Sequence, residues 1–140
     1  MKGILFLCVA NSSRSQIAEG VARSLAPSGI KVWSAGSRPA RVRPEAITVL
    51  KEIGIDISHH RSKAVAEIPA GEVDTVITLC GEEECPLFLG KARRLHWGLP
   101  DPTAVSGSEN ERLDAFRKTR DELRRRLDVL LAGGEQEEEQ

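Results

Sequence analysis

Short apolar runs alternate with longer amphipathic stretches along the first 100 residues of the chain. The runs 4–8 and 73–79 are short and apolar, residues 30–35 alternate between apolar and polar, and residues 92–97 can form a fourth extended segment. Runs of this length and composition predict β-strands. We therefore expect four strands.

Between and after these runs, apolar residues recur every three or four positions, which predicts helices with one buried face. One helix should run from Ser13 to about Ala26, and a second should start at Pro44 and end at Gly54. A short helix should precede Pro69, and a long one should cover 109–131. Strands that alternate with helices indicate an α/β fold: three α/β/α layers around a four-stranded parallel sheet, with helices on both faces.

Length and composition suit one globular domain of 1–134, followed by an acidic tail of 135–140 that we expect to be disordered. The net charge of −1 argues against a nucleic-acid partner. No apolar stretch approaches the ~20 residues that span a bilayer, and the start of the chain lacks a signal-peptide pattern. We therefore expect a cytoplasmic protein without a membrane partner. No long apolar seam remains after the core is filled, so we expect a monomer.

The first strand ends at Cys8, and five residues separate that cysteine from Arg14 at the start of a helix. Backbone N–H groups of such a loop, together with the helix N-terminus, favour a tetrahedral oxyanion, and an arginine adds a two-pronged contact. The same donors would stabilise a Cys8 thiolate as a nucleophile. A cysteine merely packed at a strand end is the alternative, which the spacing disfavours. The expected oxyanion-binding residues are Val9, Ala10, Asn11, Ser12, Ser13 and Arg14.

A second cysteine cluster follows the third strand, with four residues between Cys80 and Cys85. This spacing differs from that of zinc knuckles and no second pair completes a site, so we expect no metal. A dithiol that oxidises to a disulfide fits better. Two unrelated buried cysteines remain the alternative.

Asp101 lies between two prolines, which hold its carboxyl group on a stiff loop. A carboxyl group facing the oxyanion could donate a proton to a leaving oxygen, although an ordinary turn aspartate is the alternative. The Ser15 hydroxyl could bond the Cys8 thiolate or cap the helix, and Asn11 could order the loop from inside in a left-handed conformation. Cys8, Cys80 and Asp101 all follow expected strands, so they can meet at one edge of the sheet.

The sequence from Cys8 to Gly20 resembles the active-site loop of thioredoxin-coupled arsenate reductases, which share the low-molecular-weight protein tyrosine phosphatase fold. The resemblance covers nearly the whole chain except the acidic tail. It continues through 33–36, 54–58, 76–80, 96–98 and 101–102.

The resemblance implies a route for the reduction of arsenate, with phosphate or sulfate as analogues. Cys8 attacks arsenate held by the loop and Arg14, while Asp101 protonates the departing hydroxide. Cys80 then attacks Cys8 and arsenite leaves. Cys85 attacks Cys80 in turn, and thioredoxin reduces the resulting Cys80–Cys85 disulfide. No cofactor is implied.

Two other functions remain open at this stage. The first is a phosphomonoesterase of the same fold that uses Cys8, Arg14 and Asp101. Thr103 argues against tyrosyl substrates, because phosphatases that act on such substrates often carry an aromatic residue at this position. The second is a regulator that binds an oxyanion or senses redox state without turnover.

Some members of the resembled family bind potassium beside the active-site loop through an asparagine, a glutamate, a serine and an aspartate. Asn11, Glu19 and Ser34 match the first three, whereas Lys63 stands at the aspartate position. Because an ammonium group can take the place of the cation, we expect no potassium requirement.

Overall fold

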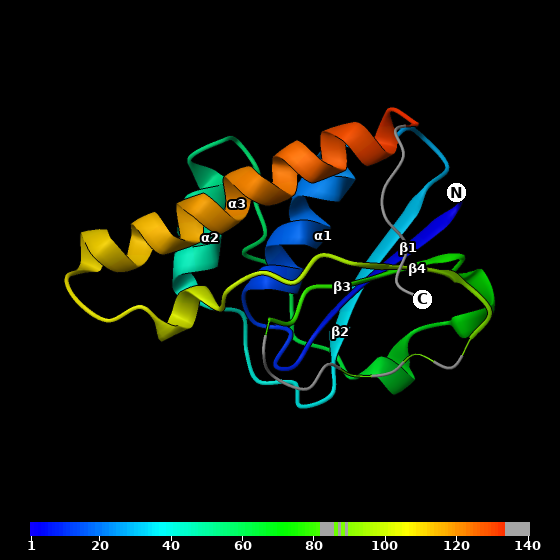
Figure 1. Ribbon diagram of the computed structural model, residues 1–140, viewed down its shortest axis with the longest axis horizontal. Coiled ribbons are helices and arrows are strands. Elements are labelled where there is room, and N and C mark those ends of the chain that lie inside the picture. Colours follow the sequence, from blue (N-terminus) through cyan, green and yellow to red (C-terminus); the bar gives the residue numbers. More distant parts are fainter. Residues whose placement is uncertain (82–85, 87, 89, 134–140) are drawn as a thin grey trace.

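A computed structural model of the chain contains one sheet of four parallel strands in the order β2–β1–β3–β4 (Figure 1). It describes residues 1–81, 86, 88 and 90–133, so the prediction for the acidic tail lies outside the described residues. The predicted four-stranded parallel sheet is confirmed. Its strands are β1 (Gly3–Cys8), β2 (Lys31–Gly36), β3 (Thr75–Thr78) and β4 (Arg93–His96).

Three α-helices cover one face of this sheet: α1 (Arg14–Leu25), α2 (Pro44–Lys51) and α3 (Glu109–Leu131) (Figure 1). The other face is covered by irregular segments and by the 3-10 turns η1 (Val65–Glu67) and η2 (Ala70–Glu72). The short helix expected before Pro69 is thus a single 3-10 turn. The outer layer on that face therefore contains turns where we expected an α-helix, because Ala64 is paired with Gly36 and only residues 65–68 remain before Pro69.

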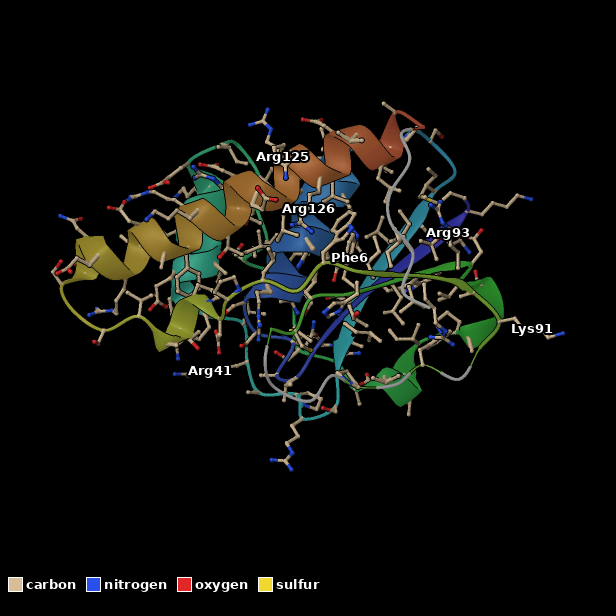
Figure 2. All side chains as sticks on the ribbon, viewed as in Figure 1. Phe6, Arg41, Lys91, Arg93, Arg125 and Arg126 are labelled. Carbon is tan, nitrogen blue, oxygen red and sulfur yellow. The ribbon has the colours of Figure 1, made fainter. Side chains whose placement is uncertain are left out.

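The two core layers follow from strand geometry. Side chains of β1 alternate between the faces: Ile4 and Phe6 pack against the helices, whereas Leu5 and Leu7 pack against the turns. Phe6 lies within the helix-side layer, whereas Arg125 on α3 projects away from it (Figure 2). Since both faces of β1 are buried, the strand reads as one continuous apolar run.

The sequence predicts the bounds of α3 because the helix carries its own start signal. Ser108 Oγ accepts a hydrogen bond from the Glu111 backbone N–H, and Glu111 Oε1 accepts one from the Ser108 N–H, each at 3.1 Å. Within the part of the chain that the structure describes, no helix is long and apolar enough to cross a membrane.

Candidate active site

The predicted nucleophile, arginine and acid line one pocket. Cys8, Arg14 and Asp101 border it together with Thr103 and four residues of the β1–α1 loop: Val9, Ala10, Ser12 and Ser13. The loop follows β1, and Asp101 begins the 3-10 turn η3 (Pro102–Ala104), which comes after β4. The structure thus brings these groups to the carboxyl edge of the sheet, where parallel α/β folds bind ligands.

Cys8 is a free thiol, 3% exposed, with its Sγ 2.9 Å from Ser15 Oγ. Asn11 Nδ2 donates a hydrogen bond to the same Ser15 oxygen at 2.7 Å. A Cys8 thiolate has no hydrogen to donate, so in that form of the cysteine the Ser15 hydroxyl is the donor to the sulfur. Ser15 therefore bonds the cysteine and does not cap α1, so the first of its two expected roles is the one observed. Charge on a Cys8 thiolate would be stabilised by this bond.

Asn11 orders the loop from inside, as expected. Its φ of 49° places it in the left-handed region, and its side chain is fully buried. Its Oδ1 accepts hydrogen bonds from the Lys63 backbone N–H at 2.8 Å and from Gln16 Nε2 at 3.0 Å. One asparagine thereby ties the oxyanion-binding loop to both α1 and the distant segment around Lys63.

A second loop, 37–43, donates backbone hydrogen bonds to carbonyl groups of the oxyanion-binding loop. Carbonyl oxygens turned toward the pocket would repel an anion, and three of them bond the neighbouring loop instead. Arg41 in this loop points away from the protein (Figure 2). The sequence does not indicate this pairing, because no periodicity or motif links the two loops. The backbone N–H to O pairs are Arg38 to Val9 (2.9 Å), Ala40 to Ala10 (3.1 Å) and Arg43 to Ser12 (2.9 Å).

Gly36, the last residue of β2, lets the two loops approach. A Cβ atom there would lie 2.4 Å from Val9 O and 2.9 Å from the backbone N of Asn11. We expect Gly36→Ala to lower the free energy of unfolding by roughly 1–3 kcal/mol and to weaken phosphate binding about tenfold or more, since the backbone must move. Calorimetric titration with phosphate and denaturant unfolding measure both effects. Gly71→Ala, where a Cβ meets nothing within 4 Å, is the control; equal phosphate affinity in both variants would contradict the prediction.

Arg14 connects the pocket to the second cysteine cluster. Its side chain is almost fully buried, and Nη1 donates hydrogen bonds to the carbonyl oxygens of Leu99 (2.9 Å) and Leu79 (3.4 Å). Leu79 directly precedes Cys80, which is buried and disulfide-bonded. The expected role of Cys85 lies outside the described residues.

Ser13 is the remaining unexplained polar group of the loop. Its hydroxyl oxygen is buried and has no hydrogen-bond partner among the described residues. Buried hydroxyl groups in proteins are normally hydrogen-bonded. The hydroxyl is therefore available to a bound oxyanion, in line with the expected role of this residue in the loop.

Next to the loop, the Glu19 carboxylate is 2% exposed and surrounded by donors. The Ser34 hydroxyl donates a hydrogen bond to it, Arg23 Nη2 lies 2.9 Å away, and Lys63 Nζ lies 3.5 Å away. His60 Nε2 is more distant, at 3.8 Å. Burial lowers the pKa of His60, although the Glu19 charge acts in the opposite direction. The neutral form is thereby favoured, which leaves Arg23 and Lys63 as the cations that balance Glu19.

The Lys63 ammonium group lies 3.5 Å from the Glu19 carboxylate and donates a hydrogen bond to the Arg61 carbonyl oxygen at 3.1 Å, so a cation already faces the carboxylate that the resemblance assigns to a potassium site. Among the described residues, no group of three or more His, Cys, Asp or Glu side chains could hold a metal ion. We expect turnover and melting temperature to be the same in potassium as in sodium at equal ionic strength. A clear rise of either quantity in potassium alone would contradict this prediction.

The chain is similar in sequence and in structure to arsenate reductases, and in sequence to low molecular weight phosphotyrosine protein phosphatases. The family model for low molecular weight phosphotyrosine protein phosphatases matches residues 3–140. The arsenate reductase of Bacillus subtilis (strain 168) is 41% identical over 128 residues, which are 90% of this chain and 92% of that protein. A solved structure of an arsenate reductase in the phosphate-binding state is 36% identical, with a TM-score of 0.80 over 96% of this chain and 100% of the other. A thioredoxin-dependent arsenate reductase of Corynebacterium glutamicum is 30% identical, with a TM-score of 0.61 over 93% of this chain and 63% of that one.

Proposed function

Because the chain belongs to the low molecular weight phosphotyrosine protein phosphatase family, and to the arsenate reductases of that fold, we propose that Cys8, Cys80 and Cys85 carry out its reaction in turn. The protein is an arsenate reductase that converts arsenate to arsenite. The assignment of individual residues below is our proposal.

In the first step, the Cys8 thiolate attacks arsenic. A sulfur–arsenic bond forms and an arsenic–oxygen bond breaks. The leaving hydroxide takes a proton from Asp101 and departs as water. The loop 9–14 and the Arg14 guanidinium hold the anion, and the Ser15 hydroxyl supports the sulfur at 2.9 Å.

In the second step, a Cys80 thiolate attacks the sulfur of Cys8. A disulfide forms and the sulfur–arsenic bond breaks. The bonding electron pair stays on arsenic, which is thereby reduced from As(V) to As(III) and leaves as arsenite. Cys85 then attacks Cys80, and the disulfide moves to Cys80–Cys85 while Cys8 departs as a thiolate.

Thioredoxin is the proposed electron donor that reduces the Cys80–Cys85 disulfide. A cytoplasmic location suits this proposal, because that compartment keeps thiols reduced. We propose a monomer, since the exposed large hydrophobic residues among those described are only Met1, Val105 and Val129. Phosphate and sulfate are expected to compete with arsenate for the loop.

One observation carries the proposal most directly: the two kinds of cysteine are in different redox states. Cys8 is a free thiol in the pocket, whereas Cys80 is disulfide-bonded. Cys80 lies next to Leu79, whose carbonyl oxygen accepts a hydrogen bond from Arg14. This combination supports a relay in which Cys8 attacks the oxyanion as a thiolate and Cys80 takes part in disulfide exchange.

The first experiment is a coupled assay of NADPH consumption with arsenate, thioredoxin and thioredoxin reductase. We expect oxidation that depends on arsenate and disappears in Cys8→Ser. A p-nitrophenyl phosphate assay runs in parallel, because a phosphomonoesterase using Cys8, Arg14 and Asp101 is the alternative. Hydrolysis without any arsenate-dependent oxidation would overturn the residue assignment in favour of that alternative.

A further inference from the structure

The two oxygens of the Asp101 carboxyl group have different surroundings. Oδ1 accepts two hydrogen bonds from Thr103: one from the backbone N–H at 2.9 Å and one from the hydroxyl Oγ1 at 2.7 Å. Oδ2 has no hydrogen-bond partner in the part of the chain that the structure describes. The carboxyl group is therefore held by one oxygen and free at the other.

Thr103 is half-buried and lines the same pocket as Cys8 and Arg14. The backbone bond alone is the ordinary cap of a short turn: Asp101 stands at the start of η3 and accepts from the N–H two residues later. The hydroxyl bond is an addition that capping does not require. It joins the same oxygen as the backbone bond and gives that oxygen a second donor, so the carboxyl group is held against rotation at Oδ1.

We propose that the Thr103 hydroxyl positions Asp101 as the proton donor, by holding Oδ1 so that the proton is carried on Oδ2. This inference rests on the proposed role of Asp101 in arsenate reduction. Thr103 acts through Asp101, so it is a positioning residue and not a catalytic one.

The physical reason is the number of donors at each oxygen. An oxygen that already accepts two hydrogen bonds is the less favourable place for a proton, because protonation weakens it as the acceptor of both bonds. When Asp101 is protonated, the hydrogen therefore lies on Oδ2. As the Cys8 sulfur–arsenic bond forms and the arsenic–oxygen bond breaks, that hydrogen passes to the departing hydroxide. Water leaves and the Asp101 carboxylate remains.

Fixing this orientation matters because proton donation depends on position before it depends on acidity. Without the hydroxyl, the carboxyl group keeps one bond to the turn and gains freedom to rotate. Only a fraction of bound arsenate would then meet a correctly placed proton. The expected loss falls on the rate of the chemical step and spares arsenate binding.

The test uses single-turnover release of arsenite from the reduced full-length protein without thioredoxin, which separates chemistry from recycling. We expect Thr103→Val, which keeps the shape and the backbone bond, to slow release about tenfold, the size of one charge-assisted hydrogen bond. The arsenate concentration at half-maximal rate should change less than about twofold. Thr103→Ser, which restores the hydroxyl, should recover most of the rate. Thr103→Ala serves as a second variant without the hydroxyl, should the valine variant fold poorly.

The decisive control is the Asp101→Asn background. If Thr103 acts through the carboxyl group, adding Thr103→Val to Asp101→Asn should cost nothing further. An unchanged rate of arsenite release in both the valine and alanine variants would overturn the proposal. So would an equal tenfold loss of rate when Thr103→Val is added to Asp101→Asn, or a change only in the arsenate concentration at half-maximal rate. A wild-type protein that releases no arsenite would instead refute the proposed residue roles, so the two failures are distinguishable.

Discussion

In the Cys80→Ser variant, we expect arsenate-dependent NADPH oxidation to fall to the background rate. A serine hydroxyl cannot attack the Cys8 sulfur to form a disulfide, so the electron pair that reduces arsenic has no source. The pocket is unaffected, since Cys8, Arg14 and Asp101 remain in place. Any hydrolysis of p-nitrophenyl phosphate should therefore persist, and it should disappear only when Cys8 is replaced.

Cys85→Ser is the matched variant, because it removes the other thiol of the same cluster. Its Cys80 can still attack Cys8, so we expect one arsenite released per chain and no further turnover with thioredoxin. Cys80→Ser should release none. Quantifying arsenite after a single turnover distinguishes the two variants. Sustained arsenate-dependent turnover in Cys80→Ser would refute the proposed order of the relay.

Replacing Arg14 with lysine should lower kcat/KM for arsenate by about 10²–10³-fold, the range found when a fixed donor to a developing oxyanion is lost. Lysine keeps the charge but not the planar pair of donors that can contact two oxygens at once. It also cannot reproduce the bonds to the carbonyl oxygens of Leu79 and Leu99 while binding the anion. The Leu79 carbonyl still accepts from the Leu99 backbone N–H, so the loss of the bond to the buried Leu99 carbonyl should lower the free energy of unfolding, by about 1–3 kcal/mol.

Steady-state kinetics with varied arsenate measure this effect, and denaturant unfolding measures the stability loss. Arg38→Lys is the control: that arginine is exposed in the neighbouring loop, and its backbone N–H still bonds Val9. We expect Arg38→Lys to stay within about threefold of the wild type, because an exposed charge contributes little to a short-range contact. An Arg14→Lys variant that behaves like this control would contradict the assigned role of Arg14.

Features that depend on neighbouring residues could be predicted from the sequence. The apolar run 4–8 predicted β1, and helical periodicity predicted the bounds of α3. The spacing of Cys8 and Arg14 indicated an oxyanion pocket for the same reason: a strand, a loop and a helix that are contiguous in the chain place both side chains. The resemblance to arsenate reductases is carried by the same local motifs.

Features that depend on distant residues could not be predicted in this way. The alternation of strands and helices indicated helices on both faces of the sheet, yet 3-10 turns and irregular segments cover the second face, because the pairing of Ala64 with Gly36 leaves only residues 65–68 before Pro69. The hydrogen bonds of loop 37–43 to the oxyanion-binding loop, and those of Lys63 to Asn11, join segments that no periodicity links.

The sequence by itself therefore determined the strand–loop–helix that holds Cys8 and Arg14, and the family to which the chain belongs. Only the tertiary structure decided how that loop is held and which oxygen of Asp101 is free. The Thr103 hydroxyl bond and the packing against Gly36 depend on the angle between backbone segments to within about an ångström. Residue type and spacing carry no information at that scale, because hydrogen-bond and contact distances are set only when the whole fold closes.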